Sequence, residues 1–190
     1  MLRTILVFFG PPGSGKGTQT NMLASILKLP AISTGALLRD ESKAKTSLAR
    51  HIKKYMMRGE MVEIPLLDKV LKKRLARKDA QKGFLLDGYP RNIHQLKHFL
   101  SLLKKDDKIL FITIGLSDLQ IMKRLLARGR ADDKVSIIKR RVKDYHSWND
   151  PLQKLARQSG VDIKIHGNQA IEKVQKDIRT KLKPYVPKIN

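Results

Sequence analysis

The chain contains the segment Gly10-Pro11-Pro12-Gly13-Ser14-Gly15-Lys16-Gly17-Thr18 between an apolar run at 5–9 and an amphipathic run at 19–28. This order indicates a buried strand, a glycine loop and a helix. The glycines permit positive φ and let backbone N–H groups approach phosphate oxygens, and the helix adds the positive end of its dipole. Lys16 supplies an ammonium for the outer phosphates. The usual phosphate-binding pattern has Ser or Thr directly after this lysine, whereas Gly17 stands there and Thr18 follows.

Length and composition predict one soluble domain. With 190 residues, of which 41% are hydrophobic, the chain can bury one sizeable core, so we expect a single domain over residues 1–190. The absence of cysteine excludes disulfides and thiolate zinc sites. A strand begins almost at once in place of a signal sequence, and no apolar run is long enough to cross a membrane. We expect a cytoplasmic monomer with no zinc and no membrane partner.

The formal net charge of +23 arises from 40 Lys and Arg against 17 Asp and Glu. The cations form pairs and triplets within helical stretches, and solvated helix faces account for most of them. The functional interpretation is a positive field that attracts polyanions, either nucleotides or nucleic acid. Charge does not separate these two, and we expect that any binding of nucleic acid is non-specific and electrostatic only.

Five short apolar runs bounded by turn residues predict the strands, at 5–9, 30–32, 83–86, 109–114 and 161–165. Uninterrupted runs of this length are typical of strands buried on both faces, and the segments between them mostly carry helical spacing. This alternation predicts an α/β fold: a five-stranded parallel sheet in three α/β/α layers, like that of P-loop nucleoside triphosphate hydrolases. Ligands of such sheets bind in the crevice at the carboxyl ends of the strands.

Three signals predict how helices begin or end. Pro65 suits the first turn of a helix. Ser117 and Gln120 form a capping box ahead of a helix at 121–128. Pro151 is expected to break or kink the long helix that begins near Asp133.

Polar residues gather where strands are expected to end. The first group is Ser33-Thr34-Gly35 with Arg39, the second is Asp87-Gly88-Tyr89-Pro90-Arg91, and the third is Arg124, Arg128, Arg130, Asp132, Asp133 and Arg141. A carboxylate at Asp87 can hold Mg²⁺-bound water beside Lys16. Convergent guanidinium groups stabilise the charge of a phosphoryl group in transfer, so the three groups together indicate phosphoryl-transfer chemistry.

These motifs resemble those of the adenylate kinase family, from about residue 2 to the last helix. The matching segments are Ser33-Thr34-Gly35 with Leu37-Leu38-Arg39, the run from Gly83 to Arg91 with Gln95, the turn Arg130-Ala131-Asp132-Asp133 and the loop form Lys16-Gly17-Thr18. The resemblance implies reversible phosphoryl transfer from MgATP to AMP, which gives two ADP and balances the adenine nucleotides. ATP, AMP and ADP are then the partners and Mg²⁺ the cofactor. It also implies that segment 33–62 is a helical insertion for the monophosphate and segment 128–133 a minimal lid.

The resemblance implies roles for individual residues. ATP would contact Gly13, Ser14, Gly15, Lys16, Gly17, Thr18, Arg124, Arg128 and Gln169. AMP would contact Thr34, Arg39, Glu60, Met61, Val62, Gly88, Arg91, Gln95, Arg130 and Arg141. The implied catalytic residues are Lys16, Asp87, Arg91, Arg130 and Arg141, with Mg²⁺ held by phosphates and by water that Asp87 orders. No general base is required, because a phosphate monoester is already mostly dianionic at neutral pH.

The chain departs from the family pattern at three places. Ala36 stands where the family has Asp, so metal handling is expected to depend more on Asp87. The lid is reduced to little more than Gly129 and its neighbours, so closure over the phosphates is expected mainly from segment 35–61. Glu60 stands where Lys or Gln is common, and little is expected to follow because the contact there is through the backbone.

Two alternatives to an AMP kinase stay open. The first is a UMP or CMP kinase, which is the nearest rival; AMP is expected to be preferred, because the donor and acceptor of the Gln95 amide fit adenine and mismatch guanine. The second is a nucleotide-gated RNA- or ribosome-binding protein with weak ATPase activity, which the positive charge and the short lid suggest. The acceptor-side arginines favour the enzyme, because a binding switch needs none of them.

Overall fold

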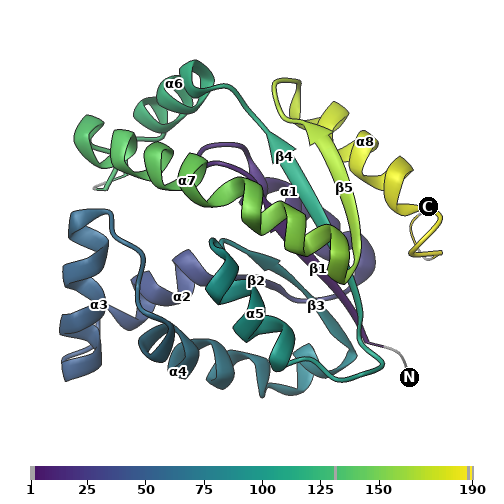
Figure 1. Ribbon diagram of the computed structural model, residues 1–190, viewed down its shortest axis with the longest axis horizontal. Helices are drawn as coiled ribbons and strands as arrows, with labels where there is room; N and C mark the ends of the chain where they lie inside the picture. Colours follow the sequence, from purple (N-terminus) through teal and green to yellow (C-terminus); the bar gives the residue numbers. More distant parts are fainter. Residues whose placement is uncertain (1–2, 131, 188, 190) are drawn as a thin grey trace.

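Five parallel strands form one sheet in the order β2-β3-β1-β4-β5 in the computed structural model, which describes residues 3–130, 132–187 and 189 (Figure 1). The strands are β1 (Thr4–Phe9), β2 (Ala31–Ser33), β3 (Gly83–Asp87), β4 (Lys108–Gly115) and β5 (Val161–His166). Each begins and ends within one residue of its predicted run, so the predicted five-stranded parallel sheet is confirmed.

Helices fill the connections between the strands. They are α1 (Lys16–Leu27), α2 (Thr34–Glu41), α3 (Ser47–Arg58), α4 (Ile64–Leu75), the short 3₁₀ helix η1 (Lys78–Lys82), α5 (Ile93–Ser101), α6 (Asp118–Arg128), α7 (Val135–Ser159) and α8 (Ile171–Leu182). Helices α1 and α8 cover one face of the sheet, and α4, α5 and α7 lie over the other (Figure 1). The predicted three layers are therefore confirmed. No helix in the described residues is long and apolar enough to cross a membrane.

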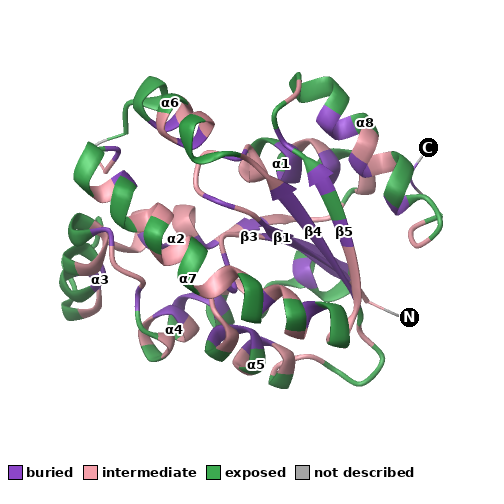
Figure 2. Ribbon diagram, turned by 45° about the horizontal axis from the view of Figure 1, so that its top comes forward, coloured by how far each residue is buried: buried purple, intermediate pink, exposed green. Residues whose placement is uncertain are grey.

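The core follows the alternation of side chains along the central strand. In β1, Ile5, Val7 and Phe9 pack with α4, α5 and α7, whereas Leu6 and Phe8 pack with α1 and α8. Because β1 is buried on both faces, it reads in the sequence as a continuous apolar run. Figure 2 shows the central strands buried and the outer helix faces exposed. The sheet is therefore packed on both faces, and its carboxyl ends carry the polar groups.

The helix signals were only partly correct. Pro65 does lie in the first turn of α4. The capping box is wrong: Ser117 is the N-cap of α6, but its side chain accepts no hydrogen bond there, and the first turn instead presents Asp118, whose charge suits a helix N-terminus. Of the two outcomes predicted for Pro151, a break is wrong, because α7 runs through it, and a kink stays a prediction. Packing of Leu152 and Ala156 in the core sustains the helix despite the missing N–H.

Candidate active site

The carboxyl ends of the strands open into a cavity of about 620 Å³. Predicted residues that line it are Gly13, Gly15, Lys16, Gly17, Thr18, Arg39, Met61, Asp87, Gly88, Arg91, Arg124, Arg128, Arg130 and Arg141. A smaller pocket of about 70 Å³ adjoins it and is lined by Thr34, Arg39, Glu60, Met61, Val62, Gly88, Arg91, Gln95 and Arg141. Arg39, Arg91 and Arg141 line both, so they stand at the junction of the two spaces. Apart from Ser14 and Gln169, the predicted ATP and AMP residues therefore line two adjoining compartments.

The glycine loop joins β1 to α1 as predicted. Gly15 is the N-cap of α1 with φ 90°, a conformation that residues other than glycine rarely adopt. Ser14 is buried beneath the loop. The Nζ of Lys16 donates to the carbonyls of Gly10, at 2.9 Å, and Pro11, at 2.7 Å, so its ammonium lies over the loop. Burial lowers the pKa of Lys16 to about 8 against the opposing effect of Asp87, and the nearby cations Arg91 and Arg128 lower it further.

Asp87 closes the end of β3 beside the loop. Its Oδ2 accepts a hydrogen bond from Ser33 Oγ at 3.3 Å, and its backbone carbonyl accepts one from Thr34 Oγ1 at 3.1 Å. A Cβ at Gly17 would lie 3.4 Å from Asp87 Oδ2, so glycine leaves room between the first turn of α1 and this carboxylate. The variant form of the loop therefore places the Asp87 carboxylate directly against the start of α1.

The smaller pocket has a rigid floor. Gln95 is buried, and its Oε1 accepts a hydrogen bond from the backbone N–H of Arg91 at 2.8 Å. Arg91 Nε donates to the carbonyl of Gly88 at 2.8 Å, which leaves the other guanidinium nitrogens for a ligand. A Cβ on Gly88 would come within 2.9 Å of Thr34 Oγ1, and its φ of +81° also requires glycine. These contacts fix the orientation of the glutamine amide and of the arginine.

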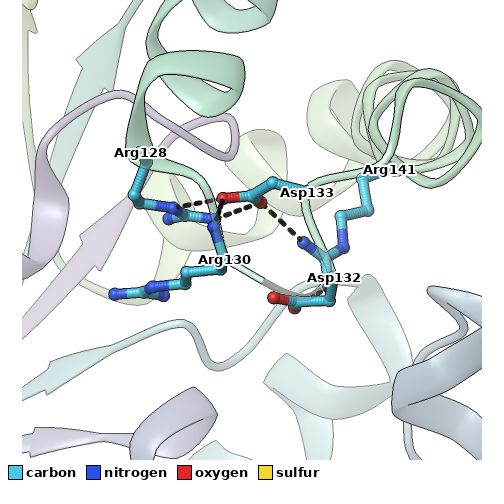
Figure 3. A network of polar contacts seen from close by, with 5 residues as sticks. All are labelled: Arg128, Arg130, Asp132, Asp133 and Arg141. Atoms are coloured by element: carbon cyan, nitrogen blue, oxygen red, sulfur yellow. Dashed lines mark hydrogen bonds and ion pairs between the residues drawn. The ribbon is translucent and has the colours of Figure 1, made fainter.

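A buried carboxylate organises the arginine-rich turn between α6 and α7 (Figure 3). The Asp133 side chain is fully buried and accepts two hydrogen bonds from Arg128, at 2.6 and 2.8 Å, and one from the Arg130 backbone N–H at 3.2 Å. Arg141 Nη1 lies 3.7 Å from the same carboxylate, and its Nη2 donates to Asp132 at 2.5 Å. Burial raises the pKa of Asp133, but the Arg128 and Arg130 hydrogen bonds outweigh it and hold that pKa below its usual range.

The Arg130 side chain extends away from this ion-paired group (Figure 3) and lines the larger cavity. Burial lowers its pKa, and the neighbouring cations Arg128 and Arg39 add to that effect. Cations that crowd one another in this way favour a bound anion, because an anion relieves their mutual repulsion. Ala131, within the predicted lid at 128–133, lies outside the described residues.

Gln169, like the buried Ser14, lines neither compartment. Its amide nitrogen donates to the carbonyl of His166 at 2.8 Å and to Asp177 at 3.0 Å, so its predicted contact with ATP stays a prediction. Arg124 lines the larger cavity and donates to the carbonyl of Gly167 at 3.1 Å, which ties α6 to the loop after β5.

The long helix α7 also faces the larger cavity with Asp144, Tyr145 and Asn149, none of which the sequence placed in the site. The role of Asp133 was also not predicted, since its residue type alone did not indicate a buried carboxylate that contacts two arginines. The signal that could have found Tyr145 and Asn149 is the spacing of four residues from Arg141 to Tyr145 and again from Tyr145 to Asn149, which puts the three on one helix face.

Comparisons with known proteins identify relatives over most of the chain. A family model described as "Adenylate kinase" matches residues 8–161. The chain is 39% identical over 181 residues to "Adenylate kinase 1" of Synechocystis sp., which covers 94% of this chain and 97% of the relative. It is 36% identical to "Adenylate kinase 1" of Nostoc sp., over 94% of this chain and 98% of the relative. It is 37% identical to "Adenylate kinase" of Prochlorococcus marinus, over 95% of this chain and 98% of the relative.

Proposed function

This chain belongs to the adenylate kinase family and is a phosphotransferase of the nucleoside monophosphate kinase class, and we propose that its two compartments convert MgATP and AMP reversibly into two ADP. One observation carries the proposal most directly: Arg91 and Arg141 line both the larger cavity and the smaller pocket. A phosphoryl group that passes between the compartments would therefore meet these two guanidinium groups. The family match does not favour a UMP or CMP kinase, or an RNA-binding protein.

The larger cavity is assigned to ATP. Backbone N–H groups of Gly13 to Thr18 and the N-terminus of α1 would bind the phosphates, as helix N-termini bind anions. Lys16, whose ammonium lies over the loop, would neutralise the outer phosphates. Arg124 and Arg128, at the inner side of α6, would contact the donor, and Gln169 would contact its base.

The smaller pocket is assigned to AMP. Arg39 and Arg91 would bind the phosphate, while Gln95 would read the base and the backbone from Glu60 to Val62 would line the nucleoside. Because Gln95 Oε1 already accepts a bond from Arg91, the amide is held in one orientation, and its NH₂ group and the second lone pair of its oxygen would be used for the base. A fixed donor beside an acceptor fits adenine and mismatches guanine.

Phosphoryl transfer in this site is electrostatic. A loose transition state spreads negative charge over the oxygens of the transferred group, and Lys16, Arg91, Arg130 and Arg141 would surround it with positive charge. Asp132 and Asp133 keep Arg141 and Arg128 in place before the substrates arrive, which reduces the reorganisation needed during the reaction. The AMP phosphate attacks without losing a proton, so no base is assigned.

The residues fit a magnesium ion that is held mainly by phosphates. In the described part of the chain, no three His, Cys, Asp or Glu side chains come together. Mg²⁺ keeps several waters and takes one or two carboxylates with substrate phosphates, so Asp87 beside the loop suits it without further carboxylates. The ion would neutralise phosphate charge, and Asp87, fixed by Ser33, would orient its water.

Segment 33–62, which holds α2 and α3, is proposed as the acceptor-binding insertion of the single domain, and 128–133 as the lid. We also propose that the protein acts as a monomer in the cytoplasm and that nucleic acid binds its surface only non-specifically. A coupled assay of ADP formation with AMP, CMP, UMP and GMP tests the substrate assignment. The proposal predicts the highest kcat/KM for AMP, and comparable values for CMP or UMP would overturn it.

A further inference from the structure

Helix α7 touches the proposed acceptor segment at a point away from the reacting groups. Arg140, on α7, donates from Nη1 to the backbone carbonyl of Arg58 at 3.1 Å, and its Nη2 lies 3.4 Å from Oε1 of Glu60. One turn earlier, Ile137 packs against Gly59 so closely that a Cβ there would lie 2.7 Å from Ile137 Cγ2. Figures 1 and 2 both show the end of α3 beside the start of α7.

The chemistry of these contacts suits a stable attachment of the end of α3 to α7. Arg58 is the last residue of α3, and carbonyls at the end of a helix lack a partner within the helix. A guanidinium there supplies the missing donor and complements the negative end of the helix dipole. Gly59, the C-cap with φ 68°, turns the chain so that the Glu60 carboxylate reaches the same guanidinium. Arg140 thus binds two successive parts of one turn.

The turn that Arg140 holds continues directly into the wall of the smaller pocket. Gly59, Glu60, Met61 and Val62 line that pocket, whereas Arg140 lines neither compartment. Arg140 therefore contacts the acceptor wall from outside. A side chain in this position can fix the wall without touching the ligand that binds inside.

We propose that Arg140 is a positioning residue for the acceptor site, and that Arg140, Ile137, Gly59 and Glu60 form a latch that docks the acceptor segment on α7. The inference rests on the function proposed above, which assigns the smaller pocket to AMP. A wall that is already ordered costs the ligand less conformational entropy on binding, so the latch raises affinity for AMP.

The short connection between α6 and α7 makes such a latch useful in this chain. Only residues 129–134 connect α6 to α7, so little chain is available to close over the phosphates. Docking of the acceptor segment on α7 brings the two sides of the cavity together by another route. Glu60 also gains a role here, because its carboxylate meets Arg140, whereas the sequence suggested that only its backbone mattered.

The test compares Arg140→Ala with Lys139→Ala, a matched loss of one exposed positive charge on the same helix. Steady-state kinetics would give KM for each substrate, calorimetry would give the Kd of AMP without ATP, and urea unfolding would give stability. Loss of one charge-assisted hydrogen bond and one half-exposed ion pair predicts a rise of about 5- to 10-fold in KM and Kd for AMP. KM for ATP and kcat at saturating AMP should change less than about twofold.

Two milder variants keep the test decisive if Arg140→Ala folds poorly. Arg140→Lys keeps a donor that can reach the Arg58 carbonyl, so it should restore part of the AMP affinity. Glu60→Gln removes only the carboxylate charge and should raise the Kd of AMP by about twofold. The latch is refuted if Arg140→Ala matches Lys139→Ala, or if KM for both substrates rises equally. A wild-type protein that forms no ADP would instead refute the proposed function, and AMP binding would still report on the latch.

Discussion

Replacement of Lys16 by Met is expected to abolish turnover and at the same time to stabilise the fold. Burial lowers the pKa of this ammonium from 10.5 to about 8, so the folded protein disfavours its charge at neutral pH. At about 1.4 kcal/mol for each pKa unit, the penalty is at most about 3 kcal/mol. Methionine removes the penalty but leaves the Gly10 and Pro11 carbonyls without their donor, at about 1 kcal/mol each.

The balance predicts that Lys16→Met raises the free energy of unfolding by about 1 kcal/mol at pH 7, while kcat falls by about 10³-fold or more. The stability that Lys16→Met gains over the wild type decreases as the pH rises. Between pH 8 and 10.5 the unfolded chain holds the Lys16 proton that the folded chain has released, so wild-type stability rises with pH in that window. The advantage of the variant is therefore full below pH 8, shrinks above it, and becomes a disadvantage as the pH approaches 10.5, where only the two lost hydrogen bonds count.

Urea unfolding of wild type and variant at a pH near 7 and near 9.5, together with the coupled assay, measures both effects. Lys82→Met, at an exposed lysine far from the loop, is the matched control and should change stability by less than about 0.5 kcal/mol. A variant that is clearly less stable than wild type at neutral pH would refute the reasoning about burial. Near-normal turnover in Lys16→Met would refute the role of the lysine in the reaction.

Three further predictions follow from the same site. Asp133→Ala should lower the free energy of unfolding by about 3 kcal/mol, because it leaves the Arg128 and Arg141 guanidinium groups without their buried partner. The control Asp106→Ala, at an exposed aspartate, should change the free energy of unfolding by less than about 0.5 kcal/mol. The pKa of Asp133 in the folded protein lies below its usual 3.8, so its contribution to stability is present above that pH and is lost as the pH falls. Urea unfolding from pH 5 downward should therefore show the stability of the wild type approaching that of Asp133→Ala. Gln95→Ala should reduce discrimination between AMP and GMP by about 1–3 kcal/mol in kcat/KM, and equal discrimination would contradict its role in reading the base. A family-length loop inserted after Gly129 should lower slow ATP hydrolysis in the absence of AMP, and an undetectable hydrolysis in the wild type would remove the basis for that idea.

The sheet was predictable because parallel strands buried on both faces leave a distinct pattern in the sequence. The run at 109–114 has no polar interruption except Thr113, and it became β4 with one more residue at each end. The gathering of Lys16, Asp87 and Arg91 was predictable for a topological reason, since all three lie at or after the carboxyl ends of the neighbouring strands β1 and β3. Local pattern and topology were therefore sufficient for the centre of the site.

Contacts between helices were not predictable in the same way. Nothing in the sequence tells that Asp133 is buried under two arginines, or that Arg140 reaches the end of α3, because both depend on how α6, α7 and α3 pack. Pro151 shows the same limit: a local rule predicted a break or a kink, and the tertiary packing of α7 kept the helix continuous. The side chains that meet across elements required the three-dimensional structure.

The central claim is reversible phosphoryl transfer between adenine nucleotides, and phosphorus NMR of the purified protein with ADP and Mg²⁺ alone tests it most directly. The account predicts that ADP disappears with the appearance of ATP and AMP in equal amounts, without inorganic phosphate, and that Lys16→Met produces neither. Release of inorganic phosphate without AMP, or no change in the ADP signals of the wild-type protein, would contradict it.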